Sequence, residues 1–280
     1  MATGSSDKDM ENNLSQEPAR LEIEKIRVDY NGVPALLEVS FQIQHGARVA
    51  VVGPNGAGKS TLFKALVGLI PLQSGQIFIH SLPLGHHKDC VAYIPQRGEV
   101  DWRFPVTVMD VVMMGRFGQM GWVQAPARID REIVQTSLRQ MGIEDLARRS
   151  ISDLSGGQQQ RVFLARALTQ QPHIILMDEP FTGVDATTQE ATMHLLDHLR
   201  QQKVTVLIST HDLALAAARF DSILLLNKRL LAFGKPEDVL TTEHLAQAFG
   251  SHILKLGDGS ILVDECCPPV DDPSLTGVVQ

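Results

Sequence analysis

The sequence predicts an α/β fold in which a mostly parallel sheet is covered by helices. Unbroken apolar runs, typical of strands buried on both faces, recur along the chain and alternate with helix-like spacing, at 49–52, 174–177, 204–208 and 223–226. A long intervening stretch, about Arg97 to Ala167, has helical character, is rich in Met and Arg, and contains no such run. We therefore expect a separate helical lobe inserted between the strands.

The two ends of the chain differ from this pattern. Residues Met1–Arg20 are polar and acidic, with almost nothing to bury, so we expect a disordered tail. From 21 to 41 short alternating stretches follow, which predict antiparallel strands with one wet face. Residues 251–280 are expected to form a hairpin over 253–263, turning at 257–259, and a flexible tail.

Composition limits the function classes. A net charge of -7 gives no support for a duplex nucleic-acid partner, so we expect no nucleic acid to bind. No apolar run approaches the roughly 18–20 residues that cross a bilayer, and the first 20 residues contain no apolar segment. We expect a cytoplasmic protein whose role at a membrane, if any, comes through another subunit. Three cysteines are too few for a disulfide framework.

A glycine-rich loop follows the first buried strand and precedes a helix expected over 59–67, with Gly68 as its stop. It fits the phosphate-binding pattern G-x-x-x-x-G-K-[ST]. Glycines let the backbone curl so that N–H groups point at phosphates, the lysine can reach the β- and γ-phosphates, and the serine can ligate Mg²⁺. The residues concerned are Gly53, Pro54, Asn55, Gly56, Ala57, Gly58, Lys59, Ser60 and Thr61.

Two acids, Asp178 and Glu179, follow the buried strand at 174–177. The carboxyl ends of parallel strands are where ligands gather in open α/β sheets. Asp178 would hold Mg²⁺ and Glu179 would polarise an attacking water. A solvated acidic turn after a strand is the alternative, and the phosphate-binding loop favours function over it.

A second phosphate-ready helix start follows Leu154, because Ser-Gly-Gly opens a helix with i,i+4 apolar pairs. One nucleotide does not need two such sites from one chain. We therefore expect a two-fold homodimer in which the second site of each chain closes over the ATP of the other. The residues concerned are Ser155, Gly156, Gly157 and Gln158.

This ordered set of motifs resembles the ATP-binding cassette (ABC) family over about Leu21 to Phe249. The set comprises the loop at 53–61, Gln96, the segment 154–158, the strand and acids at 174–179, Asp185 and His211. The resemblance implies a P-loop NTPase (RecA-like) core with an antiparallel β subdomain and an inserted helical subdomain, all within a single ABC ATPase domain at 21–250. It also implies ATP and Mg²⁺ as cofactors.

The same resemblance implies roles for single residues. Tyr30 is similar to the aromatic that stacks on adenine, although an ordinary strand aromatic is the alternative. Gln96 resembles the glutamine that senses Mg²⁺ and links the lobes, and Asp185 resembles the aspartate of the dimer interface, although Gly-Val-Asp replaces the commoner Ala-Leu-Asp. His211 resembles the histidine at the γ-phosphate, with a helix-capping role as its alternative. Ser155 and Gly157 would touch the γ-phosphate across the dimer.

A single cassette without a membrane span resembles the ATPase subunits of bacterial importers. Among these importers, the manganese/iron branch of the metal-ion importers is the most similar. The resemblance lies in the sequence segments 101–108, 111–116 and 121–122, and in Asp264-Glu265 after the hairpin. The resemblance implies a separate integral membrane permease, an extracytoplasmic metal-binding protein as an indirect partner, and a position at the cytoplasmic face of the plasma membrane. Zinc or iron-chelate import, a soluble cassette without a permease, and a non-hydrolysing scaffold are the alternatives.

Two further features have competing interpretations. Trp102, Phe104 and the Met-rich stretch at 111–116 are expected to line a groove that receives a permease helix, unless they form the core of the helical lobe. His86, His87 and Cys90 lie close together in sequence, but their spacing matches no closed zinc pattern. We expect a surface loop there, and a thiol-bearing tail at Cys266–Cys267.

Overall fold

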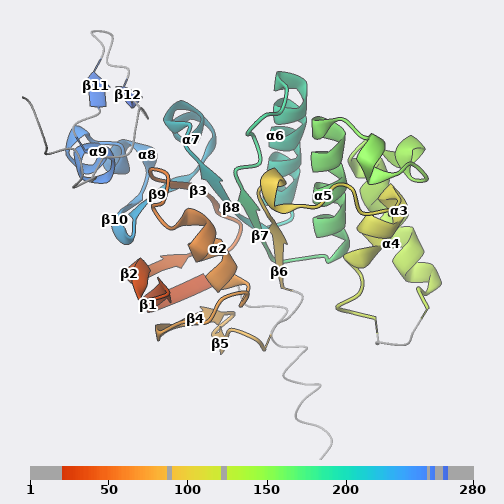
Figure 1. The fold of residues 1–280 in the computed structure, drawn as a ribbon, viewed down its shortest axis with the longest axis horizontal. Helices are drawn as coiled ribbons and strands as arrows, with labels where there is room; N and C mark the ends of the chain where they lie inside the picture. The colour runs from red at the N-terminus through yellow and green to blue at the C-terminus, as the bar shows by residue number, and fades with distance from the viewer. Residues whose placement is uncertain (1–20, 87–89, 121–124, 251–252, 256–260, 264–280) are drawn as a thin grey trace, which may run out of the picture.

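A computed structural model of the 280-residue chain describes residues 21–86, 90–120, 125–250, 253–255 and 261–263 (Figure 1). The expected N-terminal tail, His87, the 121–122 pair, the 257–259 turn, Asp264-Glu265 and the two adjacent cysteines lie outside the described residues. The strands expected on either side of that turn are present as β11 (Ile253–Lys255) and β12 (Ile261–Val263), which pair antiparallel.

The N-terminal strands form an antiparallel sheet in the order β2-β1-β4-β5, from β1 (Leu21–Tyr30), β2 (Val33–Ile43), β4 (Ser74–Ile79) and β5 (Leu82–Pro83). Alternate side chains of β2 are buried near its end, at Val39, Phe41 and Ile43. This alternation confirms the expected wet and dry faces, because successive side chains of a strand point to opposite sides.

The central sheet has the order β10-β9-β3-β8-β7-β6 and is parallel except for the β9–β10 pair. Its strands are β3 (Arg48–Val52), β6 (Val91–Ile94), β7 (Ile174–Asp178), β8 (Thr205–Thr210), β9 (Ser222–Asn227) and β10 (Arg229–Gly234). The four buried runs read from the sequence coincide with the four inner strands. The two edge strands, β6 and β10, were not predicted. Each pairs with a neighbour on one side only, and the side chains of β6 alternate in burial while most of those of β10 are half-buried.

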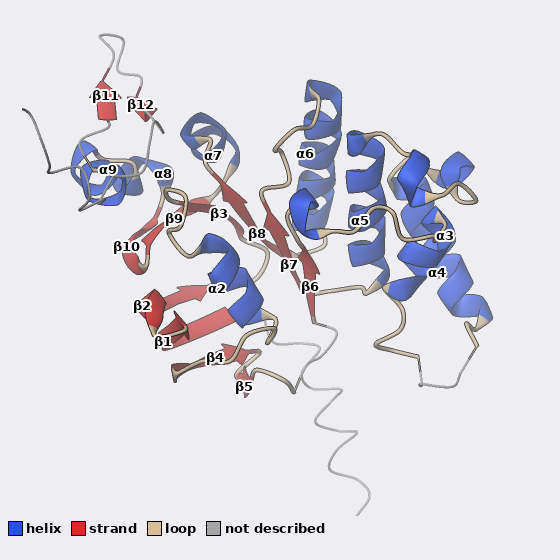
Figure 2. Cartoon of the chain, viewed as in Figure 1, coloured by secondary structure: helices blue, strands red, loops and turns tan. Residues whose placement is uncertain are grey.

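Eight α-helices lie within the described residues (Figure 2). They are α2 (Lys59–Leu66), α3 (Val108–Met114), α4 (Arg128–Gln140), α5 (Gly156–Thr169), α6 (Ala186–Gln201), α7 (Leu213–Arg219), α8 (Pro236–Val239) and α9 (Thr242–Phe249). Short 3-10 turns occupy Arg97–Glu99, Glu144–Leu146 and Ile151–Asp153. Helices α3, α4 and α5 pack on one another beyond the β6 edge, as the helical character of this stretch predicted.

Two apolar cores lie on the two faces of the central sheet. In β3, Val49 and Val51 belong to one core and Ala50 and Val52 to the other, and the other inner strands alternate in the same way. The first core also contains the inner face of the antiparallel sheet and the buried side of α2, so this helix is packed between the two sheets. The second core joins the sheet to the helices of the 97–167 stretch.

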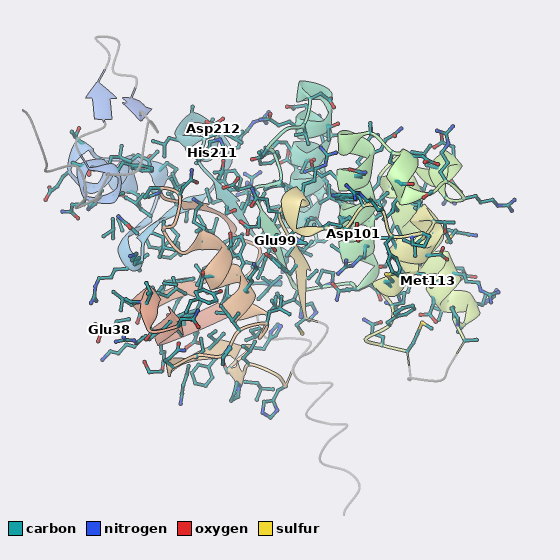
Figure 3. The ribbon with its side chains drawn as sticks, viewed as in Figure 1. Glu38, Glu99, Asp101, Met113, His211 and Asp212 are labelled. Atoms are coloured by element: carbon teal, nitrogen blue, oxygen red, sulfur yellow. The ribbon has the colours of Figure 1, made fainter. Side chains whose placement is uncertain are left out.

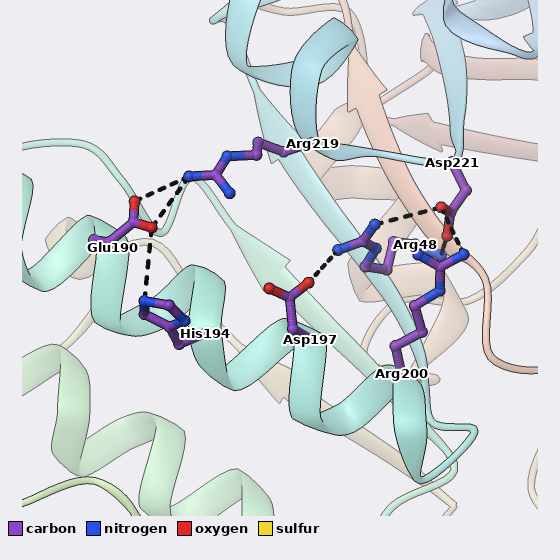
Figure 4. Close-up of polar contacts among 7 residues, drawn as sticks. All are labelled: Arg48, Glu190, His194, Asp197, Arg200, Arg219 and Asp221. Atoms are coloured by element: carbon purple, nitrogen blue, oxygen red, sulfur yellow. Dashed lines mark hydrogen bonds and ion pairs between the residues drawn. The ribbon is translucent and has the colours of Figure 1, made fainter.

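Ion pairs connect α6 with β3 and α7 (Figure 4). At the amino end of β3, Arg48 contacts Asp197 of α6 at 2.6 Å and Asp221 at 3.4 Å. Glu190 of α6 contacts Arg219 of α7 at 3.0 Å. The exposed Glu190–Arg219 pair contributes at most about 1 kcal/mol, so it orients α6 more than it stabilises it. Among the described residues, no helix has both the length and the apolar character needed to cross a membrane.

Candidate functional site

The expected site residues follow four neighbouring strands at one edge of the central sheet. The glycine-rich loop follows β3, His211 follows β8, Glu179 follows β7 and Gln96 follows β6. These strands lie in the order β3-β8-β7-β6 and are parallel, with Val52 opposite Thr210 and Asp178 opposite Ser209. Their carboxyl ends therefore share one edge, where ligands of open parallel sheets bind.

The loop between β3 and α2 curls through two left-handed glycines. Gly56 has φ 78° and Gly58 has φ 96°. A Cβ atom at Gly58 would lie 2.6 Å from the carbonyl oxygen of Ala35, so any other residue there would displace the β1–β2 hairpin. The amide of Lys228 donates to the carbonyl oxygen of Ala57 at 2.8 Å, which fixes the loop against the β9–β10 turn.

Several amides of this loop have no acceptor within the described chain. They belong to Asn55, Gly56, Gly58, Ser60 and Thr61. The last two lie in the first turn of α2. Backbone N–H groups there lack partners inside the helix, and the positive end of the helix dipole lies at this turn. An array of amides at a helix start suits an anion with several oxygens, such as a polyphosphate.

Lys59 places its ammonium group across the mouth of the loop. Its side chain is 6% exposed, and Nζ donates to the carbonyl oxygens of Gly53 at 2.7 Å and Pro54 at 3.1 Å. Gly53 itself is packed so closely against the carbonyl oxygen of Leu226 that it has no room for a Cβ. The lysine is thus held beside the free amides, where it adds positive charge for the same anion.

Asp178 ends β7 and is almost completely buried, at 2% exposed. The hydroxyl of Ser209 donates to Oδ1, but Oδ2 is buried and has no hydrogen-bond partner in the described chain. A buried carboxylate oxygen is costly to leave unpaired. A hard divalent cation beside Ser60 would satisfy this oxygen, so the donor set fits Mg²⁺. Nearby, burial first and the charge of Asp178 next raise the pKa of the Tyr93 hydroxyl.

Glu179 follows directly and takes a left-handed backbone, with φ 45°. Its amide donates to the hydroxyl oxygen of Ser209 at 2.8 Å, so one serine orients both acids. Its carboxylate oxygen Oε2 accepts hydrogen bonds from Gln96 Nε2 at 3.2 Å and from the Thr182 hydroxyl at 3.3 Å. The structure thereby brings Gln96 and Glu179 into contact. Ser209 and Thr182 were missed in the sequence, although a polar pair ending the apolar strand β8 is a visible signal.

Two further candidate residues, one from each sheet, are solvent-accessible. Tyr30 ends β1 and is 47% exposed, as a stacking ring or an ordinary strand aromatic would be. His211 is exposed just beyond β8 and forms no hydrogen bond with the described residues (Figure 3). Its neighbour Asp212 caps α7 by accepting a hydrogen bond from the Leu215 amide at 2.8 Å. The capping alternative for His211 is therefore wrong.

The second phosphate-ready motif opens α5 as expected. Ser155 and Gln158 form a capping box, in which the Ser155 amide donates to Gln158 Oε1 at 2.9 Å and the Gln158 amide donates to Ser155 Oγ at 3.4 Å. Gly156 lies against the Arg97 guanidinium. Gly157 lies against Asp185, because a Cβ there would be 3.2 Å from Oδ2 of that residue.

The phosphate-binding loop does not meet this second motif within the chain. Figure 1 places α2 and α5 on opposite sides of β6 and β7. Asp185, by contrast, stays beside Gly157 while it caps α6, accepting from the Thr188 amide at 2.9 Å. The site residues therefore form two groups, one at the sheet edge and one at the α5 start.

A small pocket of about 30 Å³ lies between the two groups. Trp102 lines it, with its ring 5.1 Å from that of Phe163 and its indole N–H donating to the carbonyl oxygen of Arg97 at 3.0 Å. Glu179 and Pro180 line the same pocket. Phe104, at 57% exposed, and the 111–116 stretch lie outside its lining. Trp102 and Met113 pack against the second core, as the alternative of a lobe core expects. The permease groove stays a prediction.

Comparison with known proteins identifies relatives of the whole arrangement. The family model described as ABC transporter matches residues 36–182. The manganese transport system ATP-binding protein MntB of Bacillus subtilis (strain 168) is 47% identical over 238 residues, covering 85% of this chain and 95% of that protein. The zinc transport system ATP-binding protein TroB of Treponema pallidum (strain Nichols) is 44% identical over 240 residues, covering 86% and 90%.

Solved structures show the same architecture. The chain superimposes on part of a metal-chelate type ABC transporter in an inward-facing conformation with a TM-score of 0.74. The two sequences are 28% identical, and the match covers 88% of this chain and 96% of that one.

Proposed function

The chain belongs to the ABC transporter family, and from this premise we propose that it is the ATP-binding and hydrolysing subunit of a metal-ion importer. The observation that carries the proposal is the shared sheet edge, where free amides, a buried lysine and an unpaired buried carboxylate oxygen converge. These are the groups that a magnesium nucleotide requires.

At this edge each residue has a distinct task. The loop from Gly53 to Thr61 would cradle the phosphates, with Lys59 balancing their charge. Ser60, Gln96 and Asp178 would hold Mg²⁺, which when bound neutralises charge on the phosphate oxygens. Tyr30 would stack on the adenine ring.

Glu179 is the residue proposed to orient the attacking water. Its hydrogen bond from Gln96 supports this, because the carboxylate is held at the sheet edge rather than turned to bulk solvent. His211 would contact the γ-phosphate from the neighbouring strand end. The contact of Gln96 with Glu179 also gives the chemistry a direct connection to the 97–167 helices, since Gln96 caps the turn that leads into them.

We place the second half of each site on a second copy of the chain. The helix that these residues open, α5, lies across β6 and β7 from α2, which follows the phosphate-binding loop; the residues are Ser155, Gly156, Gly157 and Gln158 (Figure 1). In a two-fold homodimer the α5 start of one copy would cover the γ-phosphate of the other, with Asp185 at the interface. ATP binding would then close the dimer and hydrolysis would reopen it.

A membrane partner would use this motion, because the chain is similar to the ATP-binding proteins of metal transport systems. Trp102, the exposed Phe104 and the Met-rich stretch would form the surface that receives a helix of a separate permease subunit, which would place the chain at the cytoplasmic membrane face. An extracytoplasmic metal-binding protein would deliver the cargo to that permease.

Manganese is the cargo we propose. The support is the 47% identity with a manganese transport protein over 95% of its length. Zinc is the alternative, supported by the 44% identity with a zinc transport protein. Uptake of labelled Mn²⁺ and Zn²⁺ by cells with and without the chain separates the two. Loss of zinc uptake with manganese uptake unchanged would contradict the manganese assignment.

The hydrolytic role is tested by Glu179→Gln. The amide keeps the size and hydrogen-bonding reach of the carboxylate but cannot polarise water, so we expect phosphate release to fall by roughly 10²–10⁴-fold with ATP binding retained. Size-exclusion chromatography with Mg·ATP should show an accumulated dimer. Glu190→Gln, an exposed acid on α6, is the matched control and should hydrolyse ATP normally. Normal turnover by Glu179→Gln would contradict the assignment.

A further inference from the structure

A histidine–cysteine cluster lies away from the nucleotide site. It consists of His80, Cys90 and His173, whose ligand atoms all lie within 4.8 Å of one another. Nε2 of His80 is 2.8 Å from Nδ1 of His173, and Sγ of Cys90 is 3.7 Å from the same Nδ1. The two imidazole rings meet edge to face, with centroids 4.9 Å apart.

The backbone holds two of the three side chains in place. Cys90 directly precedes β6 and His173 directly precedes β7, and the register pairs the next residues, Val91 with Ile174. The carbonyl oxygen of Cys90 accepts hydrogen bonds from the amides of His173 and Ile174, both at 2.9 Å. Their side chains are therefore neighbours on adjacent strands before any ligand binds, which lowers the entropy cost of binding.

His80 comes from the other sheet. It follows β4 in a left-handed turn, with φ 52°, and its side chain is buried, whereas Cys90 is half-buried and His173 is exposed. A ligand on all three would thus join the antiparallel sheet to the central sheet, yet remain open to solvent on one side.

The distances suit a tetrahedral metal ion. Zinc binds nitrogen at about 2.0–2.1 Å and thiolate sulfur at about 2.3 Å, which puts neighbouring ligand atoms about 3.3–3.6 Å apart. The Cys90–His173 separation of 3.7 Å already matches, and the His80–His173 pair must open by about 0.5 Å, replacing one hydrogen bond by two metal bonds.

A fourth nitrogen lies in the same neighbourhood. Nδ1 of His45 is buried and has no hydrogen-bond partner among the described residues. Burial, and then the proximity of His173, lower the pKa of His45. Either His45 or a water molecule would complete four-coordination.

We propose that His80, Cys90 and His173 form a binding site for a borderline divalent transition metal of the zinc type, separate from the nucleotide site. One thiolate and two imidazoles favour Zn²⁺ over Mn²⁺, which prefers oxygen ligands and forms the weakest complexes of the series. The site lies at the amino end of β7, whereas Asp178 ends the same strand, roughly 15–20 Å away at 3.3 Å per residue. The chain would therefore respond to zinc independently of the proposed manganese cargo.

The test uses the reduced, metal-free, full-length chain without nucleotide, so its outcome does not depend on the proposed ATPase function. Titration with Co²⁺, a spectroscopic substitute for Zn²⁺, should give a near-ultraviolet thiolate-to-metal band that is complete at one equivalent. Added Zn²⁺ should displace the bound Co²⁺ and abolish the band, whereas Mn²⁺ should not. Cys90→Ser should lose the band. His173→Gln, at an exposed position, should weaken binding by more than the roughly 10–100-fold that loss of a supporting residue costs.

A Cys266→Ser/Cys267→Ser double variant is the matched control and should keep the band. Circular dichroism of each variant reports whether it folds. Zn²⁺ should also raise the thermal midpoint of the wild type and not that of His173→Gln. A band that persists in Cys90→Ser, one that disappears in the double variant, or equal displacement by Mn²⁺ would overturn the proposal.

Discussion

At the scale of single residues, the two buried charged side chains at the sheet edge differ in how far their hydrogen-bonding groups are satisfied. Lys59 has carbonyl partners in its own loop, so the nucleotide-free chain compensates part of its desolvation. Asp178 has a partner for Oδ1 only, and its Oδ2 stays buried and unpaired. The nucleotide-free chain therefore bears a cost at Asp178 that a bound cation removes. A buried polar atom without a partner is rare in native proteins, and a bound ion is one explanation for it.

The Asp178→Asn substitution separates the cost of burying this carboxylate from its proposed role in binding Mg²⁺. Removing the charge should leave the nucleotide-free chain as stable as wild type or more stable, because a neutral amide is cheaper to bury. With a non-hydrolysable ATP analogue, Mg²⁺ should raise the thermal midpoint of wild type, corresponding to about 2.7 kcal/mol at 100 times the Kd. This magnesium-dependent increment should vanish in Asp178→Asn. Asp197→Asn, an exposed acid on α6 (Figure 4), should keep it; an unchanged increment in Asp178→Asn would refute the cation role.

The sequence allowed us to predict which residues lie at strand ends, but not which side chains contact one another in the folded chain. Asp178, Glu179 and His211 follow apolar runs, and parallel strands bring their ends to one edge. Cys90 shows the opposite case. Its sequence neighbours His86 and His87 were considered as partners, but strand register brings it to His173, and the packing of two sheets brings it to His80. Such contacts depend on tertiary structure that no local pattern encodes.

At the scale of elements, α2 connects the phosphate-binding loop to the interior. Its buried side, including Leu62, Phe63 and Leu66, packs between the two sheets, while Leu69 just beyond the helix is 64% exposed. The sequence predicted this helix, because its apolar spacing and the Gly68 stop are local signals. It did not predict β6 and β10, since edge strands pair on one side and need no continuous apolar run.

The contrast between Leu66 and Leu69 gives a matched stability test. Leu66 is 1% exposed, so Leu66→Ala should lower the free energy of unfolding by about 2–5 kcal/mol through lost burial and a residual cavity. Leu69→Ala removes the same atoms from the surface and should change it by less than about 0.5 kcal/mol. Urea unfolding of the nucleotide-free chain measures both. Equal effects of the two substitutions would show that α2 is not packed between the sheets in solution.

At the scale of the whole molecule, the two groups of site residues differ in chemistry and lie on different sides of β6 and β7. The loop with Lys59 carries the positive charge and the free amides, whereas Ser155 to Gln158 supply a second helix start on the far side of β6 and β7. The second group has its own internal order, since Gly157 packs on Asp185 and Ser155 caps α5. We propose that the α5 start meets the phosphate-binding loop of a second copy of the chain.

Complementation between two defective chains tests this sharing. Lys59→Ala removes the ammonium from the phosphate-binding loop, and Ser155→Arg blocks the α5 start, so neither variant alone should hydrolyse ATP at an appreciable rate. A mixed dimer contains one site that combines the intact Lys59 of one chain with the intact Ser155 of the other. An equimolar mixture should therefore recover up to about one quarter of wild-type phosphate release, because half of the dimers are mixed and half of their sites are intact.

The matched control mixes Lys59→Ala with the chain that carries both substitutions, since that pairing contains no intact Lys59 and should stay inactive. If the first mixture shows no more activity than its separate components, the nucleotide site must be complete within one chain. Because α2 and α5 are held on opposite sides of β6 and β7, a site within one chain would require α5 to leave the core it shares with β7. That rearrangement would expose buried apolar surface at a cost of about 25 cal/mol per Å².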